Sequence, residues 1–189
     1  MTPPVPGAGR ANRVRAGRQA GVGDTTYVLG IDPGVNLGLC VARRRGPGDL
    51  LSKFNYTVVY HHTVTSNPGE SMTSRLDVYR PALTAVVAIF EPGRAYVEVP
   101  WRHNQRNKGL SIFTRDSKNV GSIGLLCAIT GMAITTLRHC GVEVVEIPAP
   151  TGKATANWEK VKRWEAEQLT GLKLNGHEAV AFGLVMKGL

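Results

Sequence analysis

The sequence predicts an α/β fold: a mixed five-stranded sheet flanked by helices. Two observations carry this prediction. Three β-type runs come first, at residues 27–32, 37–42 and 54–65, with turn residues between them, as is typical of antiparallel strands. Helical and β-type patterns then alternate, which predicts αβ crossovers onto the same sheet. The 189 residues are enough to bury one full hydrophobic core.

Local signals delimit the first three strands. An apolar run at 27–32 ends at the turn-forming pair Pro33-Gly34, and the run at 37–42 returns after a few residues as a hairpin. Residues 54–65 are rich in Val, Thr and Tyr, which favour strands.

The next elements are a helix and a strand. Residues 72–90 carry apolar side chains at helical spacing, although Pro81 should weaken or kink the helix. A β-type run at 95–99 follows and ends at Pro100. The polar and basic stretch at 101–117 is expected to be a loop.

A long apolar helix is expected at 119–140, with Gly141 as its C-cap. Three glycines inside it are expected to let it pack closely on the sheet: Gly121, Gly124 and Gly131. A strand at 142–147, a polar helix at 155–170 and a last helix at 176–186 complete the fold.

Composition restricts the function classes. The chain has 23 Lys and Arg against 14 Asp and Glu, and its net charge of +9 favours a polyanionic partner, nucleic acid before others. Residues 1–24 are rich in Pro, Gly and Arg, which predicts a disordered basic arm ahead of a domain at 25–189. The arm either adds affinity for phosphate backbones or is an extension without function; a transit peptide is a third alternative.

The three cysteines lie in apolar runs, which excludes a disulfide scaffold and a cysteine-based zinc module and indicates a reducing compartment. No run of about 18 apolar residues is present, and the start lacks the apolar core of a secretory signal. We therefore expect no membrane association and a cytoplasmic location, in a bacterial or phage-infected host cell.

Two carboxylates lie on predicted strands. Glu98 falls in a strand that should be central and covered, where a carboxylate costs several kcal/mol unless it is paired or binds a cation. Asp32 ends the first strand. Gly30 lies on the same face as Asp32 and leaves room for a ligand or a second chain. The alternatives are a solvent-facing Glu98 and a turn-forming Asp32.

A third carboxylate, Glu178, lies at the start of the last predicted helix. Its alternative role is structural, because Asn175 as N-cap with Glu178 three residues later is a variant of the capping box. If Asp32, Glu98 and Glu178 converge, their repulsion requires cations, and oxygen ligands of this kind suit Mg²⁺. A pair of such ions supports phosphodiester hydrolysis. A basic protein with such a pocket is therefore predicted to be a nuclease.

The order of several short motifs resembles the RuvC-type Holliday junction resolvases, a family with a ribonuclease H-like fold. The resemblance covers about residues 26–186, and within the family the sequence is most similar to phage-encoded members. Its blocks are Tyr-Val-Leu-Gly-Ile-Asp-Pro-Gly, Leu-Gly-Leu-Cys-Val-Ala, Tyr-Val-Glu-Val-Pro, Val-Val-Glu-Ile-Pro-Ala-Pro followed by Lys153, and His-Glu-Ala-Val-Ala-Phe-Gly.

The resemblance implies a homodimer that binds branched DNA at a four-way junction and cuts it with Mg²⁺, or with Mn²⁺ as a substitute. It implies that Asp32, Glu98 and Glu178 are catalytic metal ligands and that Lys153 helps to bind or polarise the scissile phosphate. Glu178 replaces the family's usual Asp and is one methylene longer. The family's fourth ligand falls at Asn175, which supplies no charge, and His177 is a nearby substitute.

Two sets of basic residues are candidates for nucleic-acid binding. The alternative is that they form a solvated charged surface without a binding role. The first follows the strand of Glu98 and comprises Arg102, Arg106, Lys108, Arg115 and Lys118. The second comprises Lys160, Lys162 and Arg163. His61 and His62, in the third strand, are expected to be surface residues rather than ligands.

Two other functions stay open. One is a nuclease of the same fold that acts on RNA, like the YqgF proteins. The other is a branched-DNA-binding relative without catalysis, whose site has decayed at Asn175. The long helix at 119–140 favours a dimeric resolvase, because helices of this kind pair across a twofold axis.

Overall fold

A computed structural model of the chain describes residues 27–44, 56–67, 69–100, 120–148 and 163–187. In chain order, the elements are β1 (Tyr27–Asp32), β2 (Leu37–Arg44), β3 (Tyr56–Val64), α1 (Met72–Phe90), β4 (Arg94–Val99), α3 (Val120–His139), β5 (Glu143–Pro148), α4 (Arg163–Thr170) and α5 (Gly176–Lys187). The order of strands and helices is the predicted one.

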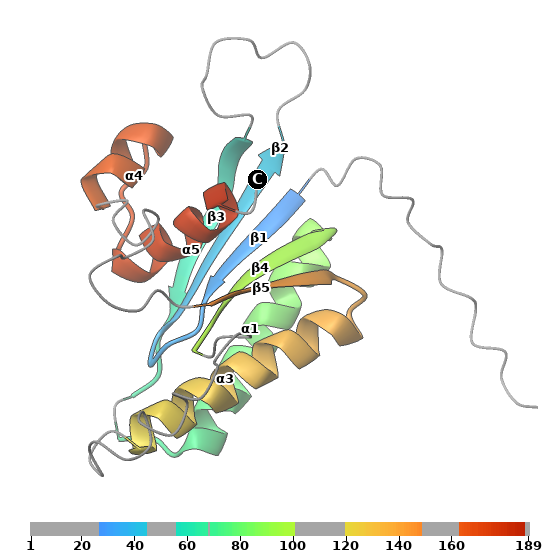
Figure 1. The fold of residues 1–189 in the computed structure, drawn as a ribbon, viewed down its shortest axis with the longest axis vertical. Coiled ribbons are helices and arrows are strands. Elements are labelled where there is room, and N and C mark those ends of the chain that lie inside the picture. Colours follow the sequence, from blue (N-terminus) through green and yellow to red (C-terminus); the bar gives the residue numbers. More distant parts are fainter. Residues whose placement is uncertain (1–26, 45–55, 68, 101–119, 149–162, 188–189) are drawn as a thin grey trace, which may run out of the picture.

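The five strands form one mixed sheet with the order β3-β2-β1-β4-β5 (Figure 1). The first three strands pair antiparallel, and β4 and β5 continue the sheet in parallel beyond β1. A register shift between Val41 and Ala42 interrupts the ladder of β2 with β3. The predicted fold class is thereby confirmed, and β1 and β4 are two of the three inner strands.

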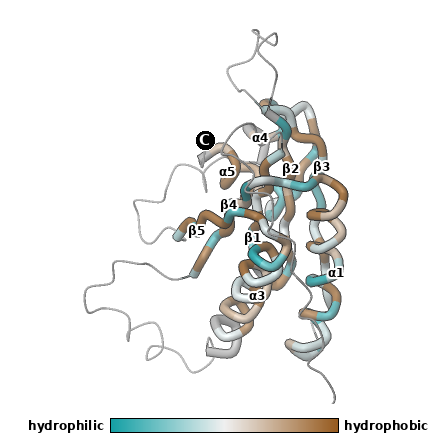
Figure 2. The backbone as a smooth tube through the Cα atoms, turned by 90° about the vertical axis from the view of Figure 1, so that its right-hand side faces the viewer, coloured by the Kyte–Doolittle hydropathy of each residue, from teal (hydrophilic) through white to brown (hydrophobic). Residues whose placement is uncertain are grey.

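Helices cover both faces of the sheet (Figure 1). Leu29, Ile31 and Val97 pack in the cluster of α1 and α3, whereas Val28 and Tyr96 pack with α5 on the other face. This is the two-residue alternation expected of strands covered on both sides. In Figure 2, β5 is mostly hydrophobic, while α1 mixes hydrophobic and hydrophilic residues, as a helix with one solvent-facing side does.

Helix α1 runs without interruption through Pro81. Proline removes the hydrogen bond to the carbonyl four residues earlier, but both Asp77 and Pro81 are exposed, so water can satisfy that carbonyl. Ser71 caps the start of the helix by accepting a hydrogen bond from Ser74 N at 3.2 Å. The expected weakening at Pro81 therefore does not break the helix.

Helix α3 ends as predicted at Gly141, which has φ +79° and donates to the carbonyl of Arg138. The expected role of its glycines is wrong for two of the three. A Cβ added at Gly124 or Gly131 would meet nothing within 4 Å, so these residues face open space. The helix contacts the core through larger side chains instead: Ile129, Ala133 and Leu137, all fully buried.

Helix α4 forms the second half of the helix expected at 155–170, and residues 155–162 lie outside the described ones. The basic arm at 1–24 and the loop at 101–117 also lie outside them. Within the part of the chain that the structure describes, no helix is long and apolar enough to cross a membrane.

Candidate active site

Asp32 and Glu98 lie side by side on the face of the sheet that α5 covers. The parallel register pairs Ile31 with Val97, so the next residues, Asp32 and Glu98, are level on neighbouring strands. The preceding residues on this face, Gly30 and Tyr96, pack against α5. Both carboxylates are half-buried. Glu98 was expected to be covered because its strand is central, and β4 is one of the inner strands.

The start of α5 lies directly over this end of β1 and β2. A Cβ at Gly30 would be 2.0 Å from the carbonyl oxygen of Ala181, and one at Gly38 would be 2.5 Å from that of His177. The expectation that Gly30 leaves room for a ligand or a second chain is wrong, because the backbone of α5 fills that space. Glycine at both positions is what lets the helix come close enough to reach Asp32.

His177 contacts Asp32, with Nδ1 at 2.8 Å from Oδ2. The hydrogen bond to Asp32 is the main cause that raises the pKa of His177; partial burial opposes it, and the charge of the carboxylate adds to it. The contact with Asp32 therefore shifts the equilibrium of the imidazole toward its charged form, in which Nδ1 donates to Asp32. The two residues are 145 positions apart in the sequence, and the packing of α5 on β1 brings them together.

Glu178 forms a reciprocal cap with Asn175. The backbone N–H of Glu178 donates to Oδ1 of Asn175 at 3.0 Å, and the backbone N–H of Asn175 donates to Oε2 of Glu178 at 3.1 Å. The Asn175 amide also donates to Oε1 of Glu178 at 3.0 Å. The capping role that the sequence offered as the alternative for Glu178 is thus present.

Two residues of β3 complete the surroundings of Glu178. His61 Nδ1 lies 2.9 Å from Oε2, and Thr63 Oγ1 lies 3.4 Å from Oε1. The expectation that His61 is a surface residue is wrong, whereas His62 is exposed. The signal that could have found His61 is the two-residue period of the strand, because His61 and Thr63 share a face opposite to that of the core residue Val64.

Cys40 pairs with His61 across the sheet and lies fully buried beneath the site. Burial and, second, the nearby charge of Glu178 raise the pKa of its thiol. The thiol therefore stays protonated, and Cys40 acts as a packing residue rather than as a nucleophile.

Solved structures with the same fold include two of RuvC from Thermus thermophilus. RuvC in complex with Holliday junction substrate matches with a TM-score of 0.60 and 20% identity, over 84% of this chain and 89% of that one. A second structure of the protein matches with a TM-score of 0.55 and 21% identity, over 84% and 90%. The fold is ribonuclease H-like, as in RuvC.

The fowlpox virus resolvase, solved with substrate Holliday junction DNA, matches with a TM-score of 0.45 and 10% identity, over 86% of this chain and 99% of that one. No protein-family model matches the sequence, and no curated protein does. The RuvC match is thus a match of fold at low sequence identity.

The RuvC resemblance implies a divalent cation, and the donor chemistry fits one, because carboxylate and amide oxygens are preferred ligands of hard cations. Two sets of candidate ligands are in contact or side by side: Asp32 lies beside Glu98 and contacts His177, and Glu178 contacts Asn175. Within the described residues, no group of three or more His, Cys, Asp and Glu side chains could hold a metal ion.

The other candidate residues of the RuvC-like site lie outside the described side chains. These are Lys153 and the basic residues Arg102, Arg106, Lys108, Arg115, Lys118, Lys160, Lys162 and Arg163; of them, Arg163 begins α4 but its side chain is not described.

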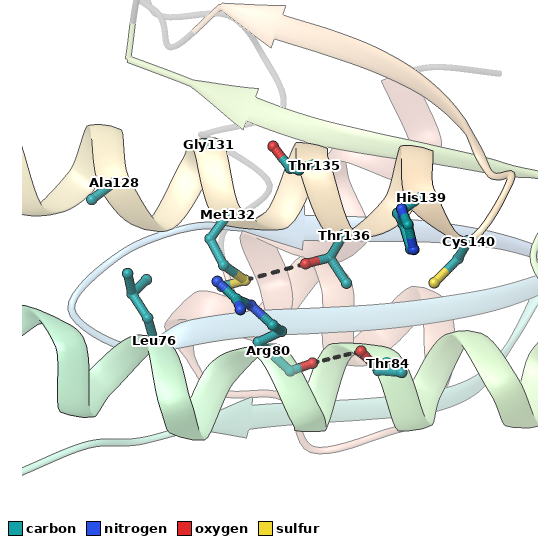
Figure 3. A pocket seen from close by; sticks show the side chains of 10 residues that line it. All are labelled: Leu76, Arg80, Thr84, Ala128, Gly131, Met132, Thr135, Thr136, His139 and Cys140. Atoms are coloured by element: carbon teal, nitrogen blue, oxygen red, sulfur yellow. Dashed lines mark hydrogen bonds between the residues drawn. The ribbon is translucent and has the colours of Figure 1, made fainter. Parts of the chain in front are cut away.

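A hollow of about 560 Å³ lies between α1 and α3, which cover the face of the sheet opposite to α5 (Figure 3). Small and apolar side chains line much of it, among them Ala128, Gly131 and Met132 from α3 and Leu76 from α1. Its polar lining consists of hydroxyl groups, Arg80 and His139. With no carboxylate in its lining, it is a surface for packing rather than a candidate for metal-dependent chemistry.

Proposed function

We propose that this protein is a metal-dependent endonuclease that hydrolyses phosphodiester bonds in Holliday junctions or other branched DNA. The observation that carries the proposal is the pair Asp32 and Glu98, level on two inner strands of a RuvC-like sheet at the point where α5 begins. Two half-buried carboxylates side by side repel each other, and a bound cation would lower that cost further than the contact of His177 with Asp32 does. The net charge of +9 supports a polyanionic substrate.

The residues that would hold the cation are Asp32, Glu98 and Glu178, with Asn175 as a further donor. His177 would be a donor only when its imidazole is neutral, because the charged ring has no free lone pair. The favoured ion is Mg²⁺, and Mn²⁺ would substitute for it. Such ions, when bound, supply an activated water and neutralise charge on the leaving oxygen.

The chain itself would provide positioning and substrate binding. His177 fixes the orientation of the Asp32 carboxylate through its 2.8 Å contact. Lys153 would bind the scissile phosphate. The two basic sets would contact backbone phosphates, and such contacts contribute affinity but little sequence preference. The residues of these sets are Arg102, Arg106, Lys108, Arg115, Lys118, Lys160, Lys162 and Arg163.

We propose further that the protein acts as a homodimer, in the cytoplasm of a bacterial or phage-infected host cell. A twofold arrangement matches a four-way junction, which offers two equivalent strands to cut. Support for the dimer comes from α3, where Gly124, Ala128 and Gly131 are spaced four and three residues apart and so share one face. The two glycines face open space. A second helix can therefore approach the α3 backbone closely along this face.

The test is cleavage of labelled four-way junction, flap and linear duplex DNA, and of a matched RNA, in Mg²⁺ and in Mn²⁺. The chain is compared with Asp32→Asn and with a control, Asp77→Asn, which removes an exposed carboxylate on α1. We expect junction cleavage that Asp32→Asn abolishes and that the control retains. Preferred cleavage of the RNA would contradict the DNA assignment and favour a YqgF-like role.

A second candidate is a branched-DNA-binding protein without catalysis. The observation that favours it is the bonding of both Glu178 carboxylate oxygens to protein groups, together with the lack, among the described residues, of a three-residue metal cluster. Junction binding without cleavage in either metal would establish this function in place of the nuclease.

A further inference from the structure

Strand β3 lies at the edge of the sheet, yet two of its side chains enter the candidate site. His61 and Thr63 both contact Glu178, from positions 117 and 115 residues away in the sequence. Neither contact was anticipated by the motifs of the RuvC resemblance. Through them the sheet holds a carboxylate that belongs to α5.

The hydrogen bonds of Glu178 assign the donor in each contact. An ionised carboxylate only accepts, so Nδ1 of His61 carries the proton that is donated to Oε2. The same oxygen accepts from the Asn175 backbone N–H at 3.1 Å, and Oε1 accepts from the Asn175 amide at 3.0 Å. Asn175 precedes Glu178 by three residues and moves with α5, whereas His61 is anchored in the sheet.

The length of the Glu178 side chain explains why a hydrogen bond from His61 would matter. Glu178 stands where the resemblance implies an aspartate, and its extra methylene adds one rotatable bond between the helix and the carboxylate. A ligand with more freedom loses more entropy when it binds a cation. A hydrogen bond from the sheet removes that freedom beforehand.

We propose that His61 is a positioning residue that holds the Glu178 carboxylate for a divalent cation, with Thr63 as a weaker second support. This inference rests on the proposed metal-dependent function. Hydrogen bonds from outer residues to metal ligands commonly change metal affinity by about 10-fold to 100-fold. His61 would thus control metal loading while contacting neither the cation nor the DNA.

The experiment measures Mn²⁺ binding to the full chain without DNA, by isothermal titration calorimetry. His61→Leu removes the donor at similar size and is expected to weaken Mn²⁺ binding by about 10-fold or more. His61→Asn returns an N–H donor near the position of Nδ1 and is expected to restore most of the affinity. The control is His62→Ala, which changes the neighbouring exposed histidine and should leave binding unchanged.

The outcomes separate this inference from the proposed function. Tight Mn²⁺ binding by the natural chain with unchanged affinity in His61→Leu would overturn the role of His61 and leave the nuclease proposal standing. No Mn²⁺ binding by the natural chain would overturn both. Electron spin-echo spectroscopy adds a further check, because a nitrogen coupling that disappears in His61→Leu would make His61 a direct ligand and contradict the positioning role.

Thermal unfolding without metal shows whether each variant is folded. If His61→Leu fails to fold, Thr63→Val tests the other support that the sheet provides to Glu178. It should weaken Mn²⁺ binding in the same direction but by less, because its contact is longer. Unchanged affinity in a folded Thr63→Val, together with lost affinity in a folded His61→Asn, would overturn the proposal.

Discussion

Tyr79 of α1 connects the helix to the turn that follows Asp32. The side chain is fully buried, and its hydroxyl donates to the carbonyl oxygen of Val35. The hydroxyl of Ser66, 2.8 Å away, then donates to the Tyr79 oxygen. One tyrosine thereby joins three segments behind the candidate site.

Tyr79→Phe should lower the free energy of unfolding by about 1–2 kcal/mol, because the Val35 carbonyl loses its buried donor. Urea denaturation measures this change. The control is Tyr56→Phe, at the half-buried start of β3, which should stay within about 0.5 kcal/mol of the natural chain. An equally large loss of unfolding free energy in Tyr56→Phe would mean that removing any tyrosine hydroxyl destabilises the protein, so the effect could not be assigned to the bond with Val35.

Local patterns predicted some site residues and missed others for a physical reason. The cap formed by Asn175 and Glu178 joins residues three positions apart, so the spacing alone was enough to offer it as the structural alternative for Glu178. The contact of His61 with Glu178 joins residues 117 positions apart, and nothing in the neighbourhood of His61 encodes its partner. Lys153 and the basic sets remain predictions, because their side chains lie outside the described ones.

At the level of elements, the packing of α5 on β1 and β2 depends on two glycines. Gly30 and Gly38 each allow a backbone carbonyl of α5 to lie where a methyl group would otherwise be. This packing brings His177 to Asp32 and Glu178 to His61, so the position of the helix determines the geometry of the site.

Gly30→Ala and Gly38→Ala should each destabilise the fold by about 1–3 kcal/mol or more, because the methyl group would overlap backbone atoms that cannot rotate away. Differential scanning calorimetry gives the change. Gly176→Ala is the matched control on α5 itself, since its added Cβ meets nothing within 4 Å. If both strand variants kept the stability of the natural chain, α5 would not lie as close to β1 and β2 as the two glycines indicate.

Periodicity predicted where the helices and strands lie, because hydrophobic spacing is a local property. It did not predict which helix packs at which glycine. Gly30 was expected to face a ligand or a second chain and instead faces α5, whereas Gly124 and Gly131 were expected to face the sheet and instead face outward. Both errors concern how elements meet, which depends on contacts between distant segments.

For the whole molecule, the outward face of α3 is where a second copy is proposed to pack. Gly131 lies on this face and lines the hollow between α1 and α3. The proposal places the twofold axis on the side of the sheet opposite to α5. Each copy would then keep its candidate site open to DNA.

Gly131→Leu should shift the protein from dimer to monomer in sedimentation velocity, because the larger side chain holds the two helices apart. Its midpoint of thermal unfolding, measured at a concentration where both proteins are monomeric, should not fall, since the site is open and leucine favours helix over glycine. Leu169→Ala, which changes an exposed residue of α4, is the control and should stay dimeric. A natural chain that sediments as a monomer at all concentrations would rule out the dimer.

The division of the core into separate clusters has a consequence for the order in which parts of the protein unfold. The cluster under α1 and α3 contains no residue of α5, which is held by two smaller clusters on the other face. Proteins open in cooperative units, and a weakly held unit opens first. Rising denaturant should therefore release α5, and with it His177 and Glu178, while the sheet and the helices of the far face keep their hydrogen-exchange protection. The candidate site would thus come apart before the sheet unfolds.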